Sequence, residues 1–328
     1  RIGTYRDLAG EWDYAGHNYY PIDLVGHGTQ VALAFLDYAL GVPQGAPRIT
    51  ALKVGNAPGA EPDAVVWALR DAAGWINNIP RQALGGPSAL TGSRAIDVIN
   101  MSFGGYDYQP ATHAAMNDVY FRSDALMVMC AGNDGQVIPA IYPGWLAHYF
   151  GTRGIVVGAA SASGSIHGYS NRAGYANMNN YIVAHAEASG PWAGTSFSAP
   201  RVTGTASAIK DRWPHLTGAQ IGSIILNTAT DMGARGPDPI YGMGMLNFGA
   251  ALSPVGGRWF SLNKSRHNVA GSTFKLSSAF SQIANANPSI SFFDAYDRDF
   301  QMSLNTERFS MAERVRQDMM WSGLGARR

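Results

Sequence analysis

The sequence predicts an α/β protein with three layers, in which a mostly parallel sheet is covered by helices on both faces. Short apolar runs with strand character alternate along the chain with longer runs of helical period, and this alternation is typical of parallel sheets. The composition agrees, because 46% of the 328 residues are hydrophobic and only 14% are charged. Such a chain favours a packed core over disorder.

The amino-terminal part contains two expected helices and one expected strand. Residues 1–26 are polar and aromatic without a clear period, so we expect loop or edge structure there. The period becomes helical from residue 28 to residue 40, with three leucines on one face. Residues 49–54 form a β-like run. Asp63 is expected to cap the helix that follows, whose apolar face continues to Ile76.

The middle of the chain carries the remaining strands of the expected sheet. Strands are predicted at residues 97–102, 125–130 and 154–159, and a helix at residues 111–122. Another helix is expected to follow Ser196. Thr217 and Gln220 have the spacing of a capping box, in which each side chain bonds the backbone N–H of the other residue. They predict a helix that ends near Ala229.

A second region begins near residue 254. The composition changes over residues 253–257, and the sequence after them is more polar and less periodic. We therefore expect a main domain at residues 1–254 and a C-terminal extension or linker at residues 255–328. The extension ends in an expected helix, opened by a capping box of Ser310 and Glu313.

Charge and hydropathy exclude several classes of function. The formal net charge is +1, so nothing in the overall charge favours nucleic acid or an anionic membrane as a partner. No apolar run reaches the roughly 18 residues that a transmembrane helix needs. Cys130 is the only cysteine, so no intramolecular disulfide can form, and its expected role is that of a small buried hydrophobe.

Ser196 has the surroundings of a nucleophile. It lies in the run Gly-Thr-Ser-Phe-Ser-Ala-Pro, just before a segment compatible with a helix. A helix that begins there places the hydroxyl at the positive end of the helix dipole, and the small neighbours let a substrate backbone approach. A nucleophilic serine also needs a base, which another part of the chain must supply.

Three further segments carry the chemistry that such a serine needs. His27 lies between two glycines, which leaves room for a nucleophile at one ring nitrogen and an acid at the other. Asn133 follows the strand that ends at Cys130, where a side-chain amide can donate to a developing oxyanion. Ser102 follows another strand, before glycines that let an extended substrate pair with the backbone. Taken alone, each segment is better explained as an ordinary turn.

Together and in this order, the four segments resemble the subtilisin-like serine peptidases, the subtilase family. The runs are Gly-His-Gly-Thr, Asn-Met-Ser-Phe-Gly-Gly, Ala-Gly-Asn-Asp-Gly and Gly-Thr-Ser-Phe-Ser-Ala-Pro, within a resemblance that covers residues 15–250. It implies a subtilisin-like three-layer fold and serine endopeptidase activity. Residues 294–300 also resemble the region after the peptidase in some bacterial autotransporters, which implies a secreted, periplasmic or cell-surface bacterial protein.

The resemblance implies a role for each motif residue. Ser196 would be the nucleophile and His27 the general base. Asn133, with the backbone N–H of Ser196, would form the oxyanion hole. The remaining motif residues would bind the polypeptide substrate: Ser102, Phe103, Gly104, Ala131, Gly132 and Thr195.

The third catalytic residue of the family, an aspartate, is not found. In the family it ends an apolar strand and precedes Ser-Gly or Thr-Gly. Asp7, Asp13 and Asp23 precede His27, but none of them fits this pattern. We expect the aspartate on a missing or separately cleaved N-terminal segment, held as a separate fragment. Asp294 is the alternative, because it ends an apolar run.

Two functions therefore stay open. One is an active endopeptidase whose acid comes from a separate fragment. The other is a catalytically impaired peptide-binding or scaffold module, because loss of the triad aspartate slows catalysis by about 10⁴-fold. No cofactor is expected. Structural calcium is common in the family, but neither Asp134 nor Asp238 has a series of ligands around it.

Overall fold

A computed structural model describes two compact units, residues 1–248 and residues 249–328. The described residues are 8–13, 23–39, 49–55, 60–73, 96–104, 107–188, 191–262, 265–269 and 289–303. Within them, no helix has both the length and the apolar character that crossing a membrane requires.

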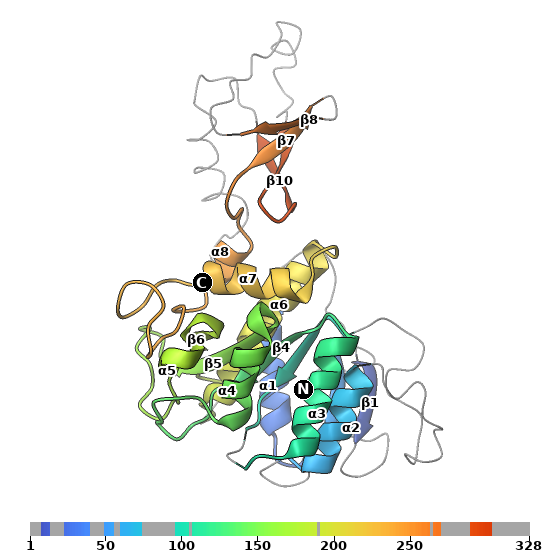
Figure 1. Ribbon diagram of the computed structural model, residues 1–328, viewed down its shortest axis with the longest axis vertical. Coiled ribbons are helices and arrows are strands. Elements are labelled where there is room, and N and C mark those ends of the chain that lie inside the picture. The colour runs from blue at the N-terminus through green and yellow to red at the C-terminus, as the bar shows by residue number, and fades with distance from the viewer. Residues whose placement is uncertain are drawn as a thin grey trace, which may run out of the picture. The chain divides into compact units, whose positions relative to one another are not determined.

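A four-stranded parallel sheet forms the centre of the first unit (Figure 1). Its strands lie in the order β3 (Val98–Met101), β4 (Leu126–Cys130), β5 (Gly154–Ala160) and β6 (Tyr181–His185). All three pairings are parallel. Every residue of β4 and β5 is buried, as expected for strands that are covered on both faces.

A separate two-stranded sheet pairs β1 (Leu8–Asp13) with β2 (Ile49–Lys53), also in parallel. All five residues of β2 are only half-buried, and so are three of the four residues of β3. Among the described strands, β2 pairs only with β1 and β3 pairs only with β4. Each of these two strands therefore has one edge without a described partner.

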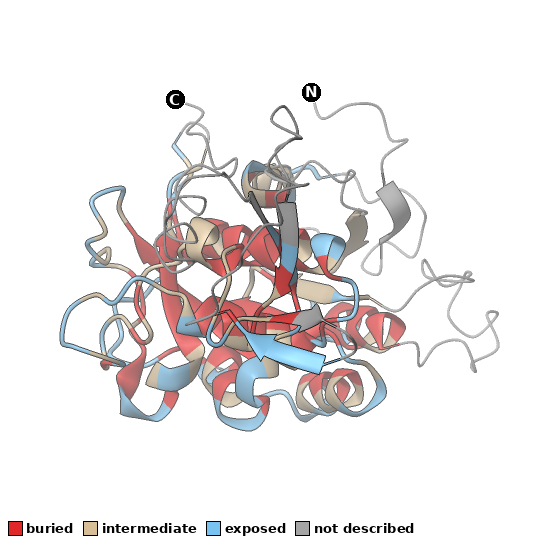
Figure 2. Cartoon of the chain, turned by 90° about the horizontal axis from the view of Figure 1, so that it is seen from above, coloured by how far each residue is buried: buried red, intermediate tan, exposed pale blue. Residues whose placement is uncertain are grey.

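Helices cover both faces of the four-stranded sheet. The long α6 (Thr195–Arg212) packs against all four strands of the sheet and against α1 (His27–Ala39). The opposite face is covered by α2 (Pro62–Ala72), α3 (Pro110–Arg122) and α4 (Ile141–Tyr149). In Figure 2 the buried residues of the helices face the sheet and the exposed ones face away. The three-layer α/β class expected from the sequence is therefore confirmed.

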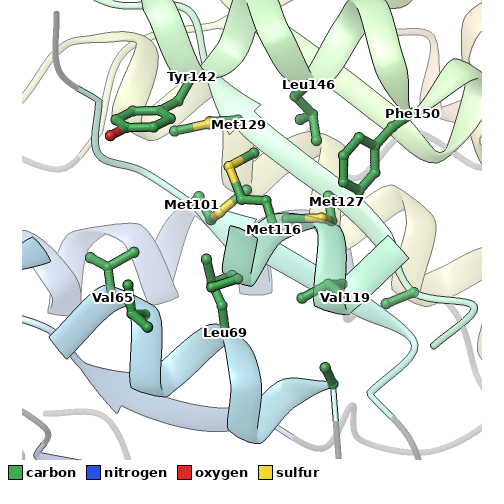
Figure 3. Packing of buried hydrophobic residues seen from close by; sticks show 14 residues of the cluster. Val65, Leu69, Met101, Met116, Val119, Met127, Met129, Tyr142, Leu146 and Phe150 are labelled. Carbon is green, nitrogen blue, oxygen red and sulfur yellow. The ribbon is translucent and has the colours of Figure 1, made fainter. Parts of the chain in front are cut away.

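The core between the sheet and this second helix layer is rich in methionine (Figure 3). Met116 of α3 lies against Met101, Met127 and Met129 of the sheet, and all four are buried. Methionine is unbranched and flexible, so it fills irregular gaps between helices and strands. The apolar faces of the surrounding helices close the cluster with Val65, Leu69, Val119, Leu146 and other residues.

The expected helix caps have different outcomes. α2 begins after Glu61 and no side chain caps it, so the cap expected at Asp63 is wrong. Asp63 lies in the first turn instead, where its negative charge interacts favourably with the positive end of the helix dipole. The capping box is confirmed at α7 (Gly218–Asn227), where Thr217 and Gln220 exchange bonds of 2.9 and 3.1 Å.

Sequence reasoning missed α4 and β6. The helix α4 begins Ile-Tyr-Pro-Gly, which reads as a turn, but Pro143 fits the first turn because an N–H there has no intrahelical partner. The strand β6 has a short signal, Tyr-Ile-Val-Ala. The loop or edge structure expected before residue 27 includes β1. In the part of the chain that the structure describes, four short helices lie between the longer elements: α5 (Gly174–Asn177), α8 (Phe248–Ala251), η4 (Gly151–Arg153) and η5 (Met178–Asn180).

The second unit contains an antiparallel sheet, in the order β10 (Asp299–Ser303), β9 (Ser289–Phe293), β7 (Trp259–Leu262) and β8 (Ser265–Asn268). Asp294 and Arg298 lie in the turn between β9 and β10 and form a fully buried ion pair of 2.7 Å. The helix expected from Ser310 lies outside the described residues.

Candidate active site

Ser196 is the second residue of α6, at the positive end of the helix. Gly194 caps this helix with a φ of +153°. The first N–H groups of a helix have no intrahelical acceptor, so they and the dipole favour negative charge beside the serine. The half-buried Ser196 hydroxyl donates to the carbonyl oxygen of Ser102 at 3.2 Å. Its position thus meets the expectation from sequence, and its hydroxyl bonds to the backbone at the end of β3.

Asn133 is held beside Ser196 by the first residue of the same helix. The backbone N–H of Thr195 donates to Asn133 Oδ1 at 2.9 Å, and the Thr195 hydroxyl donates to the same oxygen at 3.0 Å. Thr195 Oγ1 also accepts the N–H of Gly132 at 3.3 Å. Because two donors fix the carboxamide oxygen, the amide nitrogen of this exposed side chain is left to donate elsewhere.

The end of β3 approaches the same helix turn. The Ser102 hydroxyl donates to the carbonyl oxygen of Ser196 at 2.7 Å, and Asn100 Nδ2 donates to Ser102 Oγ at 2.9 Å. Phe103 is half-buried and packs against the methionine-rich cluster. Gly104 is exposed, and a Cβ placed on it would lie 4.0 Å from the Cβ of Ala140. Ser102 therefore joins the backbone of β3 to the backbone of the predicted nucleophile.

His27 is the first residue of α1 and its ring lies against aromatic residues around Ser196. The ring centroids of His27 and Phe197 are 5.4 Å apart, and those of His27 and Trp192 are 6.5 Å apart. Burial lowers the pKa of His27 below its ordinary value, and the negative charge of Asp23 opposes that shift. A neutral imidazole, which a general base requires, is thus favoured near neutral pH.

The model of the Subtilase family matches residues 4–244. The chain belongs to the subtilase family. The family consists of serine proteases, whose substrates are polypeptides.

Individual relatives resemble different lengths of this subtilase. Subtilisin DY of Bacillus licheniformis is 29% identical over 247 residues, 71% of this chain and 79% of that protein. The Neisserial autotransporter lipoprotein NalP of Neisseria meningitidis serogroup B is 44% identical over 61 residues, 19% of this chain and 6% of that protein. The crystal structure of a lanthipeptide protease is similar in fold, with a TM-score of 0.56 at 23% identity over 74% of this chain and 80% of that one.

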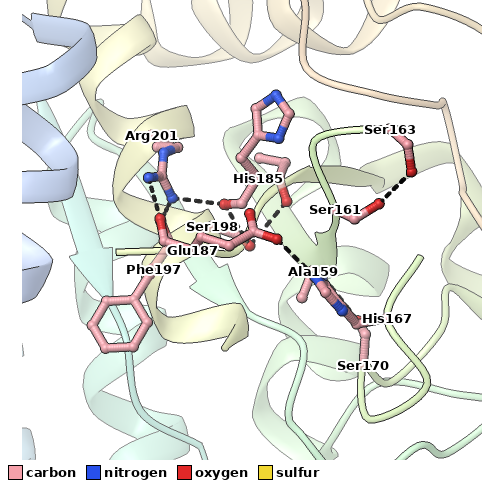
Figure 4. Close-up of polar contacts among 11 residues, drawn as sticks. Ala159, Ser161, Ser163, His167, Ser170, His185, Glu187, Phe197, Ser198 and Arg201 are labelled. Carbon is pink, nitrogen blue, oxygen red and sulfur yellow. Dashed lines mark hydrogen bonds and ion pairs between the residues drawn. The ribbon is translucent and has the colours of Figure 1, made fainter. Parts of the chain in front are cut away.

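The first turns of α6 in this subtilase are held by buried polar side chains (Figure 4). Arg201 donates through Nη1 to the carbonyl oxygens of His185 and Phe197, at 2.7 and 2.9 Å. Ser198 donates to the carbonyl oxygen of His185 at 3.0 Å. These bonds join the helix that carries Ser196 to the end of β6, so the serine stands on a fixed helix turn.

The helix that carries His27 packs closely on the one that carries Ser196. A Cβ placed on Gly204 of α6 would lie 2.5 Å from the carbonyl oxygen of Phe35 and 3.0 Å from the Cβ of Tyr38. Only glycine permits this approach of the two backbones. The position of His27 relative to Ser196 is thus set by direct contact between α1 and α6.

Cys130 lies beneath the site at the end of β4 and is buried. Burial raises the pKa of its thiol to about 11, although hydrogen bonds with the side chains of Thr195 and Ser196 oppose the shift. The expected role as a small buried hydrophobe fits this environment. Ala131, next in the chain, is fully buried as well, and it contributes its backbone to the site through bonds with Val157 and Ala140.

The structure accounts for two of the four candidate aspartates. Asp23 accepts the N–H groups of Gly26 and Thr29 at 2.8 and 2.7 Å, so its carboxylate caps the start of α1. Burial raises the pKa of Asp23, but these hydrogen bonds outweigh that effect and lower it. Asp294 is saturated by Arg298 and by backbone N–H groups of its own turn. Asp13 ends β1, and Asp7 lies outside the described residues.

No carboxylate within the described residues is hydrogen-bonded to the His27 ring. In the same part of the chain, no group of three or more His, Cys, Asp or Glu side chains is arranged to hold a metal ion. Asp238 uses both carboxylate oxygens to accept backbone N–H groups of its own loop. Its conformation therefore has a structural explanation that involves no ion.

Sequence reasoning also missed Asn171, a buried residue after β5 whose side chain bonds to the loop that carries Asn133. No local pattern marks it, because these partners lie 35 to 40 residues away. The contact of Thr195 with Asn133 was likewise invisible in the sequence, since it joins residues 62 apart.

Proposed function

We propose that this subtilase is an endopeptidase that forms an acyl-enzyme on Ser196. His27 is the general base, and the oxyanion hole consists of Asn133 Nδ2 and the backbone N–H of Ser196. The observation that carries the proposal is the pair of bonds from Thr195 to Asn133 Oδ1. They orient the amide of Asn133 as a donor beside the serine before any substrate binds, and preorganised donors usually contribute more to the rate of acyl transfer than any other group.

In the proposed reaction, the Ser196 hydroxyl leaves the Ser102 carbonyl and turns to His27, which takes its proton as Oγ bonds to the substrate carbonyl carbon. The two donors of the hole stabilise the tetrahedral oxyanion. His27 then gives the proton to the leaving amine as the C–N bond breaks. Water then attacks the acyl carbon while His27 takes a proton from it. The ester C–O bond breaks as His27 returns that proton to Ser196 Oγ, which releases the carboxylic acid product and restores the hydroxyl.

The acid that orients His27 is proposed to lie on a strand outside residues 1–328, as a missing or separately cleaved segment. The edges of β2 and β3 favour this idea. Both strands are half-buried, whereas β4 and β5 are wholly buried. Apolar side chains of both strands, Val54 just after β2 and Ile99 of β3, pack against the same hydrophobic cluster. One further parallel strand between them would make the two sheets continuous.

The substrate and location are proposed from the family and its members. The substrate is a polypeptide, bound along Ser102, Phe103 and Gly104 and against the segment of Ala131 and Gly132. A secreted, periplasmic or cell-surface location is favoured by the 44% identity of 61 residues to a protein named as an autotransporter lipoprotein.

Labelling with an alkyl fluorophosphonate tests the proposed function, because this reagent phosphonylates an activated serine. The protein purified from its natural host, with the proposed acid-bearing segment still bound, should be labelled at Ser196, as read by mass spectrometry of its peptides. Ser196→Ala should abolish labelling, and Ser165→Ala, at an exposed serine outside the site, is the matched control that should keep it. Absence of labelling in that preparation, with a normal melting transition, would contradict the proposal.

The source of the acid needs a separate measurement. Native mass spectrometry of the protein from its natural host should show a bound N-terminal fragment that contains Asp-Ser-Gly or Asp-Thr-Gly. Its removal should slow labelling by about 10⁴-fold. Asp13→Asn should have little effect. A loss of that size in Asp13→Asn, or full activity of the isolated chain, would place the acid within residues 1–328.

A second candidate function is a peptide-binding or scaffold module with little catalysis. It is favoured by one observation, that no described carboxylate bonds to His27. Under this alternative, the Ser196→Ala variant binds peptides as well as the wild-type chain does, and neither is labelled by the fluorophosphonate.

A further inference from the structure

Asn171 binds the loop between β4 and α4 with both ends of its carboxamide. Its Oδ1 accepts the N–H groups of Asp134 and Gln136, each at 3.0 Å, and its Nδ2 donates to the carbonyl oxygen of Ala131 at 3.1 Å. Asn171 is fully buried. Three bonds from one buried side chain therefore reach the loop on both sides of Asn133.

The backbone of Asn171 adds a fourth bond to the same loop. Its N–H donates to the carbonyl oxygen of Gly132 at 3.0 Å. Gly132 has a φ of +108°, and a Cβ there would collide with the carboxamide nitrogen of Asn171. Glycine at this position thus satisfies both the left-handed backbone and the close approach of Asn171.

A second layer of side chains holds Asn171 itself. The Tyr181 hydroxyl donates to the carbonyl oxygen of Asn171 at 2.6 Å, and the Ser170 hydroxyl donates to the same oxygen at 3.0 Å. The Tyr181 hydroxyl occupies the space over Gly158 of β5, where any Cβ would overlap it. The hold on the loop therefore extends through Asn171 to the buried first residue of β6.

We propose that Asn171 is a positioning residue for the oxyanion hole, which it serves by fixing the backbone on either side of Asn133. Thr195 of α6 fixes the side chain of Asn133, and Asn171 fixes the backbone of the loop that carries it. The proposal rests on the proposed function of Asn133. It has a physical basis, since an oxyanion donor must lie within about 2.7–3.1 Å of the developing charge. A displacement of about 1 Å can cost 10²-fold in rate.

The test is the second-order rate constant for labelling of Ser196 by an alkyl fluorophosphonate in the full chain. Asn171→Ala should lower it at least about tenfold, and by no more than the 10²–10³-fold loss expected of Asn133→Ala, a magnitude measured in subtilisin. Tyr181→Phe removes one hydroxyl and keeps the ring, so it should lower the rate about two- to tenfold. It carries the test if Asn171→Ala does not fold.

A double-mutant cycle separates positioning from general loosening. In an Asn133→Ala background, Asn171→Ala and Tyr181→Phe should each change the rate by less than about twofold, because the donor through which they act is gone. Losses that persist undiminished in that background would overturn the proposal. The midpoint of the pH profile of labelling, which reports His27, should be unchanged in both single variants.

Asp238→Asn is the matched control. Asp238 is also buried and also pins a loop, by accepting the N–H groups of Ala234, Ile240 and Tyr241 at 3.1, 2.7 and 2.8 Å. It should lower the melting temperature and leave the labelling rate within about twofold. A loss in this control equal to that of Asn171→Ala would mean that Asn171 has only a structural role.

Hydrogen exchange keeps this test separate from that of the proposed function. Peptides that span residues 131–136 should exchange faster in Asn171→Ala than in the wild-type chain, whether or not either chain is active. Unchanged exchange there would overturn the inference. A wild-type chain that is never labelled would defeat the proposed function alone, while the exchange still reports whether Asn171 holds the loop.

Discussion

The two halves of the site are held in different ways. On the nucleophile side, Ser196 and Asn133 are joined through Thr195 and Ser102 by hydrogen bonds that reach β3, α6 and the loop after β4. On the base side, His27 lies against the rings of Phe197 and Trp192, and no described carboxylate bonds to it.

The difference shows what each half needs in order to act. Hydrogen bonds fix both the place and the direction of a donor, so Asn133, the proposed oxyanion donor, is already oriented without substrate. Ring packing fixes where the imidazole lies and leaves open which nitrogen carries the proton. Under the proposed mechanism, the nucleophile side is therefore complete within the described residues, and the base side needs an acid that fixes the tautomer of His27.

Removal of the proposed base, His27, should lower the labelling rate of Ser196 more than any other change considered. His27→Ala should lower the fluorophosphonate labelling rate by about 10²–10⁴-fold, the range over which a positioned general base contributes. The rate is read by gel fluorescence at several times. His148→Ala, at an exposed position of α4, is the matched control and should label normally. If His27→Ala keeps most of the labelling rate, His27 does not act as the base, and only the side of the site with Ser196 and Asn133 contributes to the reaction.

A smaller change tests how tightly the oxyanion half is built. Thr195→Val keeps the shape and the backbone N–H of Thr195 but removes the hydroxyl that donates to Asn133. One neutral hydrogen bond corresponds to about 1 kcal/mol, so the labelling rate should fall about two- to tenfold. Thr205→Val, at another buried threonine of α6, controls for the exchange of a hydroxyl for a methyl group in this helix. Equal rates in both variants would show that the backbone N–H alone orients Asn133.

The pH profile of labelling tests the role of His27. Burial lowers the pKa of His27 below 6.5, so labelling should rise with pH around a midpoint below that value. The charge of Asp23 opposes the shift, so Asp23→Asn should move the midpoint lower still. The unfolded chain binds this proton more tightly, so His27 also costs stability as the pH falls below 6.5. A midpoint above 6.5 would indicate that a carboxylate already bonds the ring.

The thiol beneath the nucleophile should have the smallest effect. Because burial raises the pKa of Cys130 to about 11, iodoacetamide at pH 8 should not alkylate it in the folded chain. Cys130→Ala should change the labelling rate by less than about threefold, since a neutral thiol makes only weak hydrogen bonds. Mass spectrometry of reacted samples, with unfolded chain as the positive control, measures the alkylation. Rapid reaction in the folded state would show that the thiol has access to the site.

Prediction from sequence succeeded where the signal is local. The strand before Asn133 and the helix after Ser196 each follow from a few adjacent residues, and so does the capping box of Thr217. The prediction that Asp63 caps α2 was wrong for the same reason. An acidic residue in the first turn of a helix resembles a cap when it is read without the residues before it.

The supporting layer of the site could not be predicted in this way. Asn171 and Thr195 matter through bonds to residues that lie 35 to 63 positions away, and a polar residue in a loop has many local explanations. The half-buried edges of β2 and β3 are likewise a property of the assembled sheet. The sequence of each strand, read alone, gives no sign that one of its edges lacks a described partner.

Gly204 lies at a close contact between α1 and α6, the helices that carry His27 and Ser196. Ser196 lies eight residues before this contact, a lever of about 12 Å at 1.5 Å per residue. A tilt of about 5° at the contact would therefore move the hydroxyl about 1 Å relative to the imidazole, enough to slow the reaction about 10²-fold. The size of the side chain at position 204, far from the reacting atoms, therefore limits how far the Ser196 hydroxyl can be displaced from the His27 imidazole.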